Sequence, residues 1–98
     1  MTKKEQTVQS EIMSYLTDEV GAHVTKYNVN GYGRKGEPDL FASIPHDPYP
    51  IAVYIEVKKV GGVLSPLQKV KVKRLKEAGH LVLVADKVEI VKHFIHTL

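Results

Sequence analysis

A turn built from prolines, set between two predicted strands of which the second is rich in β-branched residues, constrains the fold of this chain more than any other feature. Residues 39–44 and 51–60 are both typical of strands. Prolines at positions 45, 48 and 50 enclose the turn between them. The sequence therefore predicts an antiparallel hairpin whose two strands are joined across residues 45–50.

The register of this hairpin brings three charged side chains together. If the strand that starts at Asp39 pairs with the strand up to Glu56, the midpoint of the two positions, 47.5, falls inside the proline turn. Because side chains alternate between the two faces of a strand, Lys58 shares the face of Glu56. We therefore expect Asp39, Glu56 and Lys58 to converge at one end of the hairpin, among apolar neighbours.

One helix is predicted before the hairpin in the sequence, and another is predicted after it. Apolar side chains at helical spacing indicate an amphipathic helix over residues 5–20, and Gly21 is a suitable terminator. Ser65 and Pro66 are typical of the start of a second helix, which Gly79 ends.

Further strands and a last helix complete the order αβββαβα. Residues 22–29, rich in β-branched and aromatic residues, predict a strand. Residues 81–85 are apolar without alternation, which predicts a short central strand covered on both faces. Asp86 is a candidate cap for a last helix. At 98 residues the chain is expected to form one α/β domain, residues 1–98, with a mixed central sheet flanked by helices.

Composition excludes several classes of function. The chain has no cysteine, which excludes disulfides, thiolate catalysis and cysteine-ligated zinc or iron–sulfur sites. No apolar run approaches the roughly 20 residues of a membrane span, and no apolar segment follows the basic start to form a signal peptide. We therefore expect no membrane partner and a cytoplasmic location.

Positive charge is concentrated in the second predicted helix and the segment before it. Residues 58–76 carry seven basic side chains and no acidic one. Such a stripe attracts a polyanion, and nucleic acid is the obvious candidate. A solvated helix face explains the same charges, so the stripe alone does not choose between the two interpretations. If DNA binds there, the candidate phosphate contacts are Lys69, Lys73 and Arg74.

Two facing carboxylates among apolar residues indicate a metal site. Buried carboxylates are costly unless a partner or a metal neutralises them, and oxygen ligands suit Mg²⁺ or Mn²⁺. Such an ion can polarise a phosphoryl oxygen and activate a water. Lys58 beside it could act as a general base or stabilise charge on a phosphate, and the residues leave both roles open. A surface ion pair is the bland alternative for Glu56 and Lys58.

A glycine-rich loop, residues 31–36, matches the G-x-G-x-x-G pattern of dinucleotide-binding folds. That fold needs a helix starting in the loop, whereas Glu37 and Pro38 follow here, so we reject this interpretation. Arg34 and Lys35 are instead candidates for phosphate contacts, and Tyr32 for stacking on an exposed base. Ordinary surface is the alternative for all three.

The sequence resembles the VRR-NUC family, the virus-type replication-repair nucleases of the PD-(D/E)xK superfamily. The resemblance runs from about residue 8 to residue 84. It rests on Glu11 in the first helix, Gly36-Glu37-Pro38-Asp39-Leu40, Glu56-Val57-Lys58, and Leu64-Ser65-Pro66-Leu67-Gln68. It implies a restriction-endonuclease-like core and phosphodiester hydrolysis dependent on Mg²⁺ or Mn²⁺.

The same resemblance implies roles for single residues. Asp39 and Glu56 would be metal ligands, helped by the Val57 carbonyl, with Lys58 catalytic and Glu11 and Gln68 auxiliary. Two of these assignments have rivals in the sequence itself. Glu19 lies nearer the centre of the apolar stripe than Glu11, and Ser65-x-x-Gln68 is also a capping box.

Small stand-alone members of the family resemble endonucleases that act as homodimers on four-way (Holliday) junctions or related branched DNA, in a bacterial or phage-infected cell. Two-fold symmetry would present two active sites to two strands. Ile90 and Phe94 of the last helix are candidates for the dimer face. A non-cleaving nucleic-acid-binding module of the same fold is the alternative function, although such a module would be free to lose Asp39, Glu56 and Lys58.

Overall fold

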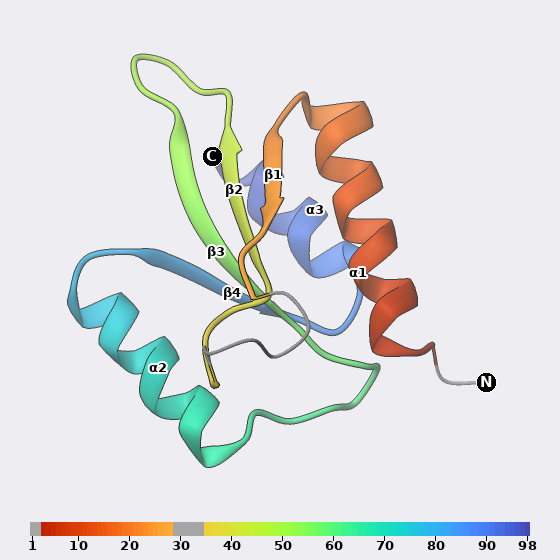
Figure 1. Cartoon of the computed structure of the whole chain (residues 1–98). Coiled ribbons are helices and arrows are strands. Elements are labelled where there is room, and N and C mark those ends of the chain that lie inside the picture. The colour runs from red at the N-terminus through yellow and green to blue at the C-terminus, as the bar shows by residue number, and fades with distance from the viewer. Residues whose placement is uncertain (1–2, 29–34) are drawn as a thin grey trace.

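A four-stranded mixed sheet forms the centre of the computed structural model, which describes residues 3–28 and 35–98 (Figure 1). The strand order is β1-β2-β3-β4, with β3 antiparallel to β2 and parallel to β4. Among the described residues the elements are α1 (Glu5–Ser14), the π-helical segment η1 (Tyr15–Val20), β1 (His23–Lys26), β2 (Leu40–Ile44), β3 (Ile51–Val57), α2 (Pro66–Glu77), β4 (Leu81–Ala85) and α3 (Val88–His96). The predicted α/β class and element order are confirmed.

The hairpin of β2 and β3 has the register expected from its turn. Leu40 pairs with Ile55, and Ile44 pairs with Ile51 at the turn end. Every pair in this ladder is centred on the same midpoint within the proline turn, so Asp39, just before β2, lies level with Glu56. The hairpin therefore carries the two carboxylates to the same end of the sheet.

The first helix covers one face of the sheet and supplies much of the core. Val8, Ile12 and Leu16 recur at helical spacing and are fully buried. The helix is α-helical to Ser14, widens into η1, and ends at Gly21, whose φ of 77° is left-handed. These side chains pack against the inner positions of the hairpin, Leu40, Ala42, Ile44, Val53, Ile55 and Val57. Helix α3 adds Val91 to the same core.

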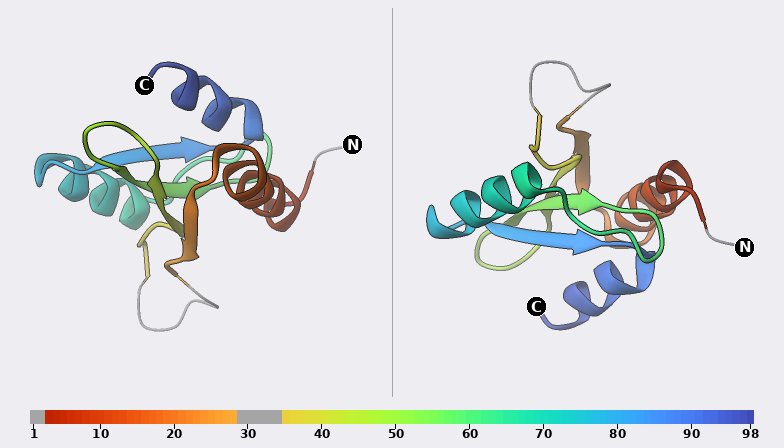
Figure 2. Two further views of the ribbon diagram at one scale, coloured as in Figure 1. Left: turned by 90° about the horizontal axis from the view of Figure 1, so that it is seen from above. Right: turned by 90° about the horizontal axis from the view of Figure 1, so that it is seen from below.

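On the other face of the sheet α2, the crossover between β3 and β4, packs against β4. Figure 2 shows α2 on one side of β4 and α3 on the other. The parallel pairing of β3 and β4 fixes where α2 starts, because the chain must turn back along the sheet from the end of β3. The N-terminus of α2 is thereby placed beside the carboxylate end of the hairpin.

Two expectations for the C-terminal part were wrong. The strand over residues 81–85 is an edge strand, not a central one, and it leaves Leu81 and Val84 exposed. An unbroken apolar run does not separate the two situations, because an edge strand between two helices also buries most of its side chains. Asp86 does not cap α3; its Oδ2 accepts a hydrogen bond from the Gly61 N–H at 3.1 Å.

No helix among the described residues has the length and apolar character needed to cross a membrane.

Candidate functional site

Asp39 is fixed at the site by its own backbone and side chain. Its carbonyl oxygen accepts hydrogen bonds from the Tyr27 N–H at 2.7 Å and from the Asn28 N–H at 3.3 Å. Its Oδ2 accepts from the Val57 N–H on β3 at 2.8 Å. These contacts hold the carboxylate across the hairpin in one orientation, as a preorganised ligand requires.

Glu56 is the one buried charged residue among those described, with 1% of its surface exposed. Its Oε1 accepts a hydrogen bond from Gln68 Nε2 at 2.9 Å. Its Oε2 is buried and has no hydrogen-bond donor within the described structure. An oxygen left in that condition costs free energy unless a proton or a cation reaches it.

Gln68 makes the contacts of both roles that the sequence left as rivals, the helix cap and the neighbour of the carboxylates. Its backbone N–H donates to Ser65 Oγ at 3.1 Å, and its Oε1 accepts from the Ser65 N–H at 2.8 Å, which completes a capping box at the start of α2. The same Oε1 accepts from Lys58 Nζ at 3.1 Å while Nε2 donates to Glu56. The helix cap therefore holds the amide between Glu56 and Lys58.

Lys58 is the residue that directly follows β3, and its side chain extends to the site. Its backbone N–H donates to the Ala85 carbonyl at 2.9 Å and so extends the pairing of β3 with β4. Its ammonium group lies half-buried against Gln68, on the face that it shares with Glu56. Asp39, Glu56, Lys58 and Gln68 are thus brought together by two strands and one helix.

Burial and repulsion between the two carboxylates raise the pKa of Glu56 to about 8. Loss of solvent is the largest cause, followed by the nearby charge of Asp39 and a hydrogen bond shared between the two carboxyl groups. Lys58 opposes the shift, and Glu5 adds to it. A hydrogen bond between two carboxyl groups needs a proton on one of them, and loss of that proton leaves Glu56 Oε2 buried without a donor among the described residues.

The donor set fits a hard divalent cation. A cation between Asp39 and Glu56 would satisfy the orphaned Oε2 and remove the repulsion that raises the pKa of Glu56. Within residues 3–28 and 35–98, no three side chains of His, Cys, Asp or Glu form a metal-binding group. Two carboxylates and backbone or water oxygens are a coordination set that Mg²⁺ accepts.

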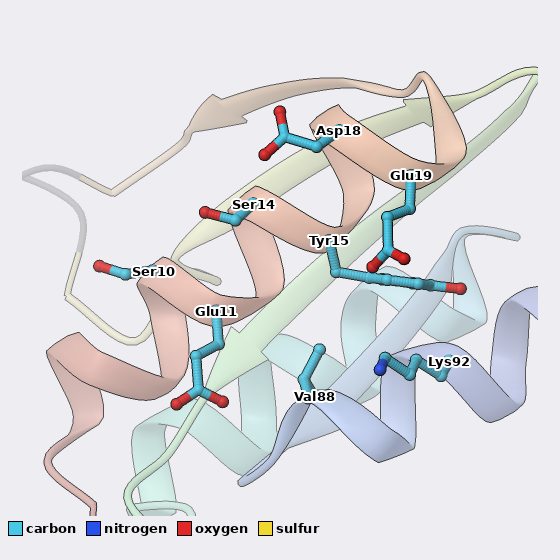
Figure 3. A pocket seen from close by; sticks show the side chains of 8 residues that line it. All are labelled: Ser10, Glu11, Ser14, Tyr15, Asp18, Glu19, Val88 and Lys92. Carbon is cyan, nitrogen blue, oxygen red and sulfur yellow. The ribbon is translucent and has the colours of Figure 1, made fainter.

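Glu11 is not joined to the other candidates by any interaction among the described residues. It forms an ion pair with Lys3, whose Nζ lies 2.8 Å from Glu11 Oε1. It also lines a separate pocket of about 540 Å³ on the outer side of the first helix, beside α3 (Figure 3). Tyr15 and Lys92 lie in that pocket too, with the ammonium 5.3 Å from the ring centroid.

Glu5, which the sequence analysis did not single out, is the carboxylate of α1 whose charge acts on Glu56. It is exposed at the first position of the helix, at the end that points toward the exit of β3. Helical spacing could not identify it, because an acidic residue in a first turn is common and serves the helix dipole equally well.

The loop before Asp39 is held against α2. Gly36 adopts a φ of +81°, and a Cβ there would lie 2.7 Å from Leu67 Cγ, so only glycine fits. Glu37 forms an ion pair with Lys71 at 3.3 Å. Arg34 and Tyr32, both expected to contact nucleic acid, lie outside the described residues, whereas Lys35 is exposed.

The basic residues of α2 occupy two environments. Lys69, Lys73 and Arg74 are exposed, as phosphate contacts must be. Lys71 is half-buried in its pair with Glu37. The exposed three therefore stay candidates for DNA contact, next to a site that their own helix helps to build.

Comparisons with known proteins point to one family. The family model described as the VRR-NUC domain matches residues 1–88. A solved structure titled "VRR_NUC domain" is 27% identical and superimposes with a TM-score of 0.77 over 96% of each chain. A second, "VRR_NUC domain protein", is 21% identical, with a TM-score of 0.67 over 98% of this chain and 88% of that one, and shows the fold alone. The search of curated proteins finds no match.

Proposed function

The chain belongs to the VRR-NUC domain family, a family of nuclease domains, and from this premise we propose that it is a Mg²⁺- or Mn²⁺-dependent DNA endonuclease. One observation supports the metal dependence: Glu56 is buried beside Asp39, and its Oε2 has no hydrogen-bond donor among residues 3–28 and 35–98. The reaction is hydrolysis of a phosphodiester bond. The substrate class is branched DNA, with the four-way junction as the first candidate.

The residues that would hold the metal are Asp39, Glu56 and the Val57 carbonyl. When bound, the cation supplies positive charge that polarises a phosphoryl oxygen and lowers the pKa of water. Asp39 and Glu56 contribute by being fixed before substrate arrives, through the Val57 N–H and the Gln68 amide. This preorganisation removes the cost of orienting ligands during the reaction.

Lys58 is the proposed catalytic cation. Its ammonium group is positioned by Gln68 Oε1, which the cap of α2 fixes in turn. From there it can stabilise negative charge on the scissile phosphate or, if deprotonated, take a proton from the attacking water. Gln68 is a positioning residue in this scheme because it touches Glu56 and Lys58 and need not touch DNA.

The experiment for this function compares a labelled four-way junction with a linear duplex of the same sequence. Each is incubated with purified protein in Mg²⁺, in Mn²⁺ and in EDTA. We expect cutting of the junction in either metal, little cutting of the duplex, and none in EDTA. Binding without cutting in both metals would instead support the non-cleaving module, and equal cutting of both DNAs would remove the preference for branches.

We propose that α1 contributes the carboxylate of Glu5, and not that of Glu11, to the active site. We expect Glu5→Gln to reduce the cleavage rate more than Glu11→Gln does, because Glu5 is the α1 carboxylate whose charge reaches Glu56. Glu11→Gln, the matched control on the same helix, should cut at nearly the wild-type rate, because Glu11 pairs with Lys3. Single-turnover rates decide, and the reverse ranking of the two variants would restore Glu11.

Binding is expected to weaken with salt in proportion to the phosphates contacted. Three contacts from Lys69, Lys73 and Arg74 give a slope of about −2.7 in log affinity against log salt, at roughly −0.9 for each phosphate. Lys73→Ala should make the slope shallower by about 0.9, whereas Lys92→Ala, on α3, should leave it unchanged. A slope that does not respond to Lys73→Ala would exclude α2 from the DNA interface.

We also propose a homodimer, because apolar side chains remain exposed on neighbouring elements at one edge of the sheet. Leu81 and Val84 of β4 are 44% and 38% exposed, and Ile90 of α3 is 37% exposed. Phe94 packs partly against the core, which makes Ile90 the better probe. Ile90→Glu is expected to halve the mass in solution while the thermal unfolding transition persists. A dimeric variant with an intact fold would exclude this surface.

A further inference from the structure

Within the described residues, no helix covers the half of the site-bearing sheet face that lies over β1, β2 and the start of β3. α2 lies on this face, and among the described residues it packs against β4 (Figure 2). The side chains that share the face on the other strands remain accessible: His23, Thr25 and Ala52 are exposed, and Ser43 is half-buried. This half of the face therefore meets solvent beside the two carboxylates.

Aromatic rings make up the middle of this open surface. Phe41 and Tyr54 are paired across β2 and β3, with centroids 5.0 Å apart. Tyr54 also meets Tyr27 at 5.2 Å and His80 at 5.3 Å. All of these contacts are edge-to-face, so the rings do not stack their flat faces on one another. We call these four residues the aromatic platform.

The platform is continuous with the candidate active site. Phe41 follows Asp39 by two residues on one strand, and Tyr54 precedes Glu56 by two on the next. Residues two apart on a strand point the same way and lie about 7 Å apart. A strand of DNA whose scissile phosphate sits at the carboxylates would therefore have its next nucleotide over the rings.

The chemistry of the surface fits an unpaired nucleotide better than a protein segment. Its floor is made of aromatic, imidazole and hydroxyl groups, and the cation Lys58 lies at the end next to the carboxylates. A second cation, the exposed Lys35, directly precedes Gly36, which packs on α2. Rings beneath bases with cations beside phosphates are the pattern of single-strand recognition. A base that is already paired and stacked in a duplex has no flat face to offer.

We propose that the aromatic platform stacks an unpaired base next to the scissile phosphate, so that the nucleotide at the cleavage position is unpaired in the bound substrate. This inference rests on the proposed function, because it places the scissile phosphate at Asp39 and Glu56. It narrows the substrate class from branched DNA in general to branches that are open at the cleavage position when bound.

The test uses a flap DNA that carries 2-aminopurine at its first unpaired nucleotide, in Ca²⁺ to allow binding without cutting. Stacking on the platform is expected to quench the probe on binding of wild-type protein. Tyr54→Leu should abolish the quenching and weaken binding of the unpaired strand by about 5- to 100-fold. Tyr54→Phe keeps the ring and should behave as wild type.

A matched control makes the same chemical change away from the platform. Tyr49, 75% exposed in the turn between β2 and β3, is replaced in Tyr49→Leu, which should leave quenching and affinity unchanged. If Tyr54→Leu does not fold, as judged by thermal unfolding, Phe41→Leu takes its place with the same expected losses.

The outcomes separate this inference from the proposed function. Quenching that persists in the leucine variant, or wild-type binding without quenching, overturns the platform even when the junction is cut in Mg²⁺. Quenching that depends on the ring supports the platform even when no metal produces cutting, and the failed proposal is then the nuclease activity.

Discussion

Glu56→Gln is expected to abolish DNA cleavage and, at the same time, to stabilise the metal-free protein. Cleavage should fall by about 10³-fold or more, because a metal ligand contributes several kcal/mol to the reaction. Stability should rise because glutamine is neutral, whereas Glu56 in the folded protein must either keep a proton that the unfolded chain releases or ionise beside Asp39 while buried. Few substitutions at a ligand position combine these two effects, so the pair is diagnostic.

The pH dependence of this stabilisation follows from the sign of the pKa shift. Burial and Asp39 raise the pKa of Glu56 to about 8 in the folded state, while the unfolded chain has the ordinary value of 4.5. Between these values the folded protein holds a proton that the unfolded chain has released. The free energy of unfolding therefore decreases as pH rises from 4.5 to about 8, by on the order of a few kcal/mol in total.

Thermal unfolding in EDTA at pH 5 and at pH 8 measures this effect. The wild type should lose stability between the two pH values, and Glu56→Gln should lose much less. Adding Mn²⁺ should restore the wild type at pH 8 and leave the variant unchanged. A variant that is less stable than wild type at pH 8 in EDTA would contradict the account of Glu56.

Lys58→Ala is the second large expected loss. The cleavage rate should fall by about 10²- to 10⁴-fold, which is the usual cost of removing a group that transfers protons or stabilises charge at the reacting atoms. Lys59→Ala, which removes the neighbouring exposed lysine, should retain the wild-type rate. Single-turnover cleavage at saturating metal compares the two variants.

Metal binding distinguishes the role of Lys58 from a merely structural one. The positive charge of Lys58 lowers the pKa of Glu56, so its removal should raise that pKa further. Removing that charge also removes its repulsion of Mn²⁺, so Lys58→Ala should still bind Mn²⁺, most clearly at pH 9, where Glu56 is ionised. Cleavage should not recover at pH 9. A variant whose cleavage returns together with its metal affinity would show that Lys58 acts only through Glu56.

The hairpin and its carboxylates were predictable because the prolines leave little choice of register. A shift of the strand register by one residue would turn Glu56 toward the core, and it would turn the apolar residues on either side of Glu56 toward solvent. The proximity of Asp39, Glu56 and Lys58 then follows from alternation alone. The sequence also indicated both sets of contacts of Gln68, the helix cap and the contact with the site. They look like alternatives in the sequence, because only the position of α2 against the end of β3 allows one side chain to make both.

The errors share a physical cause: they concern which elements become neighbours. Residues 81–85 form an edge strand because the crossover through α2 adds them beside β3, with no later strand to cover them. The assignment of Glu11 stays a prediction, because Glu11 and Glu5 both lie on α1 and the periodicity of this helix identifies its buried residues but not the end that approaches the site. The widening at η1 also alters the helical spacing that placed Glu19 near the stripe centre.

Calorimetric titration of the protein with Mn²⁺ at pH 7, repeated in buffers of different ionisation enthalpy, tests the central claim most directly. Glu56 is largely protonated at this pH because its pKa is about 8. We expect binding of the metal to release about one proton in the wild type, and both the binding and the release to be lost in Glu56→Gln. Binding without proton release, or binding that survives in Glu56→Gln, would contradict a metal centre built on Asp39 and Glu56.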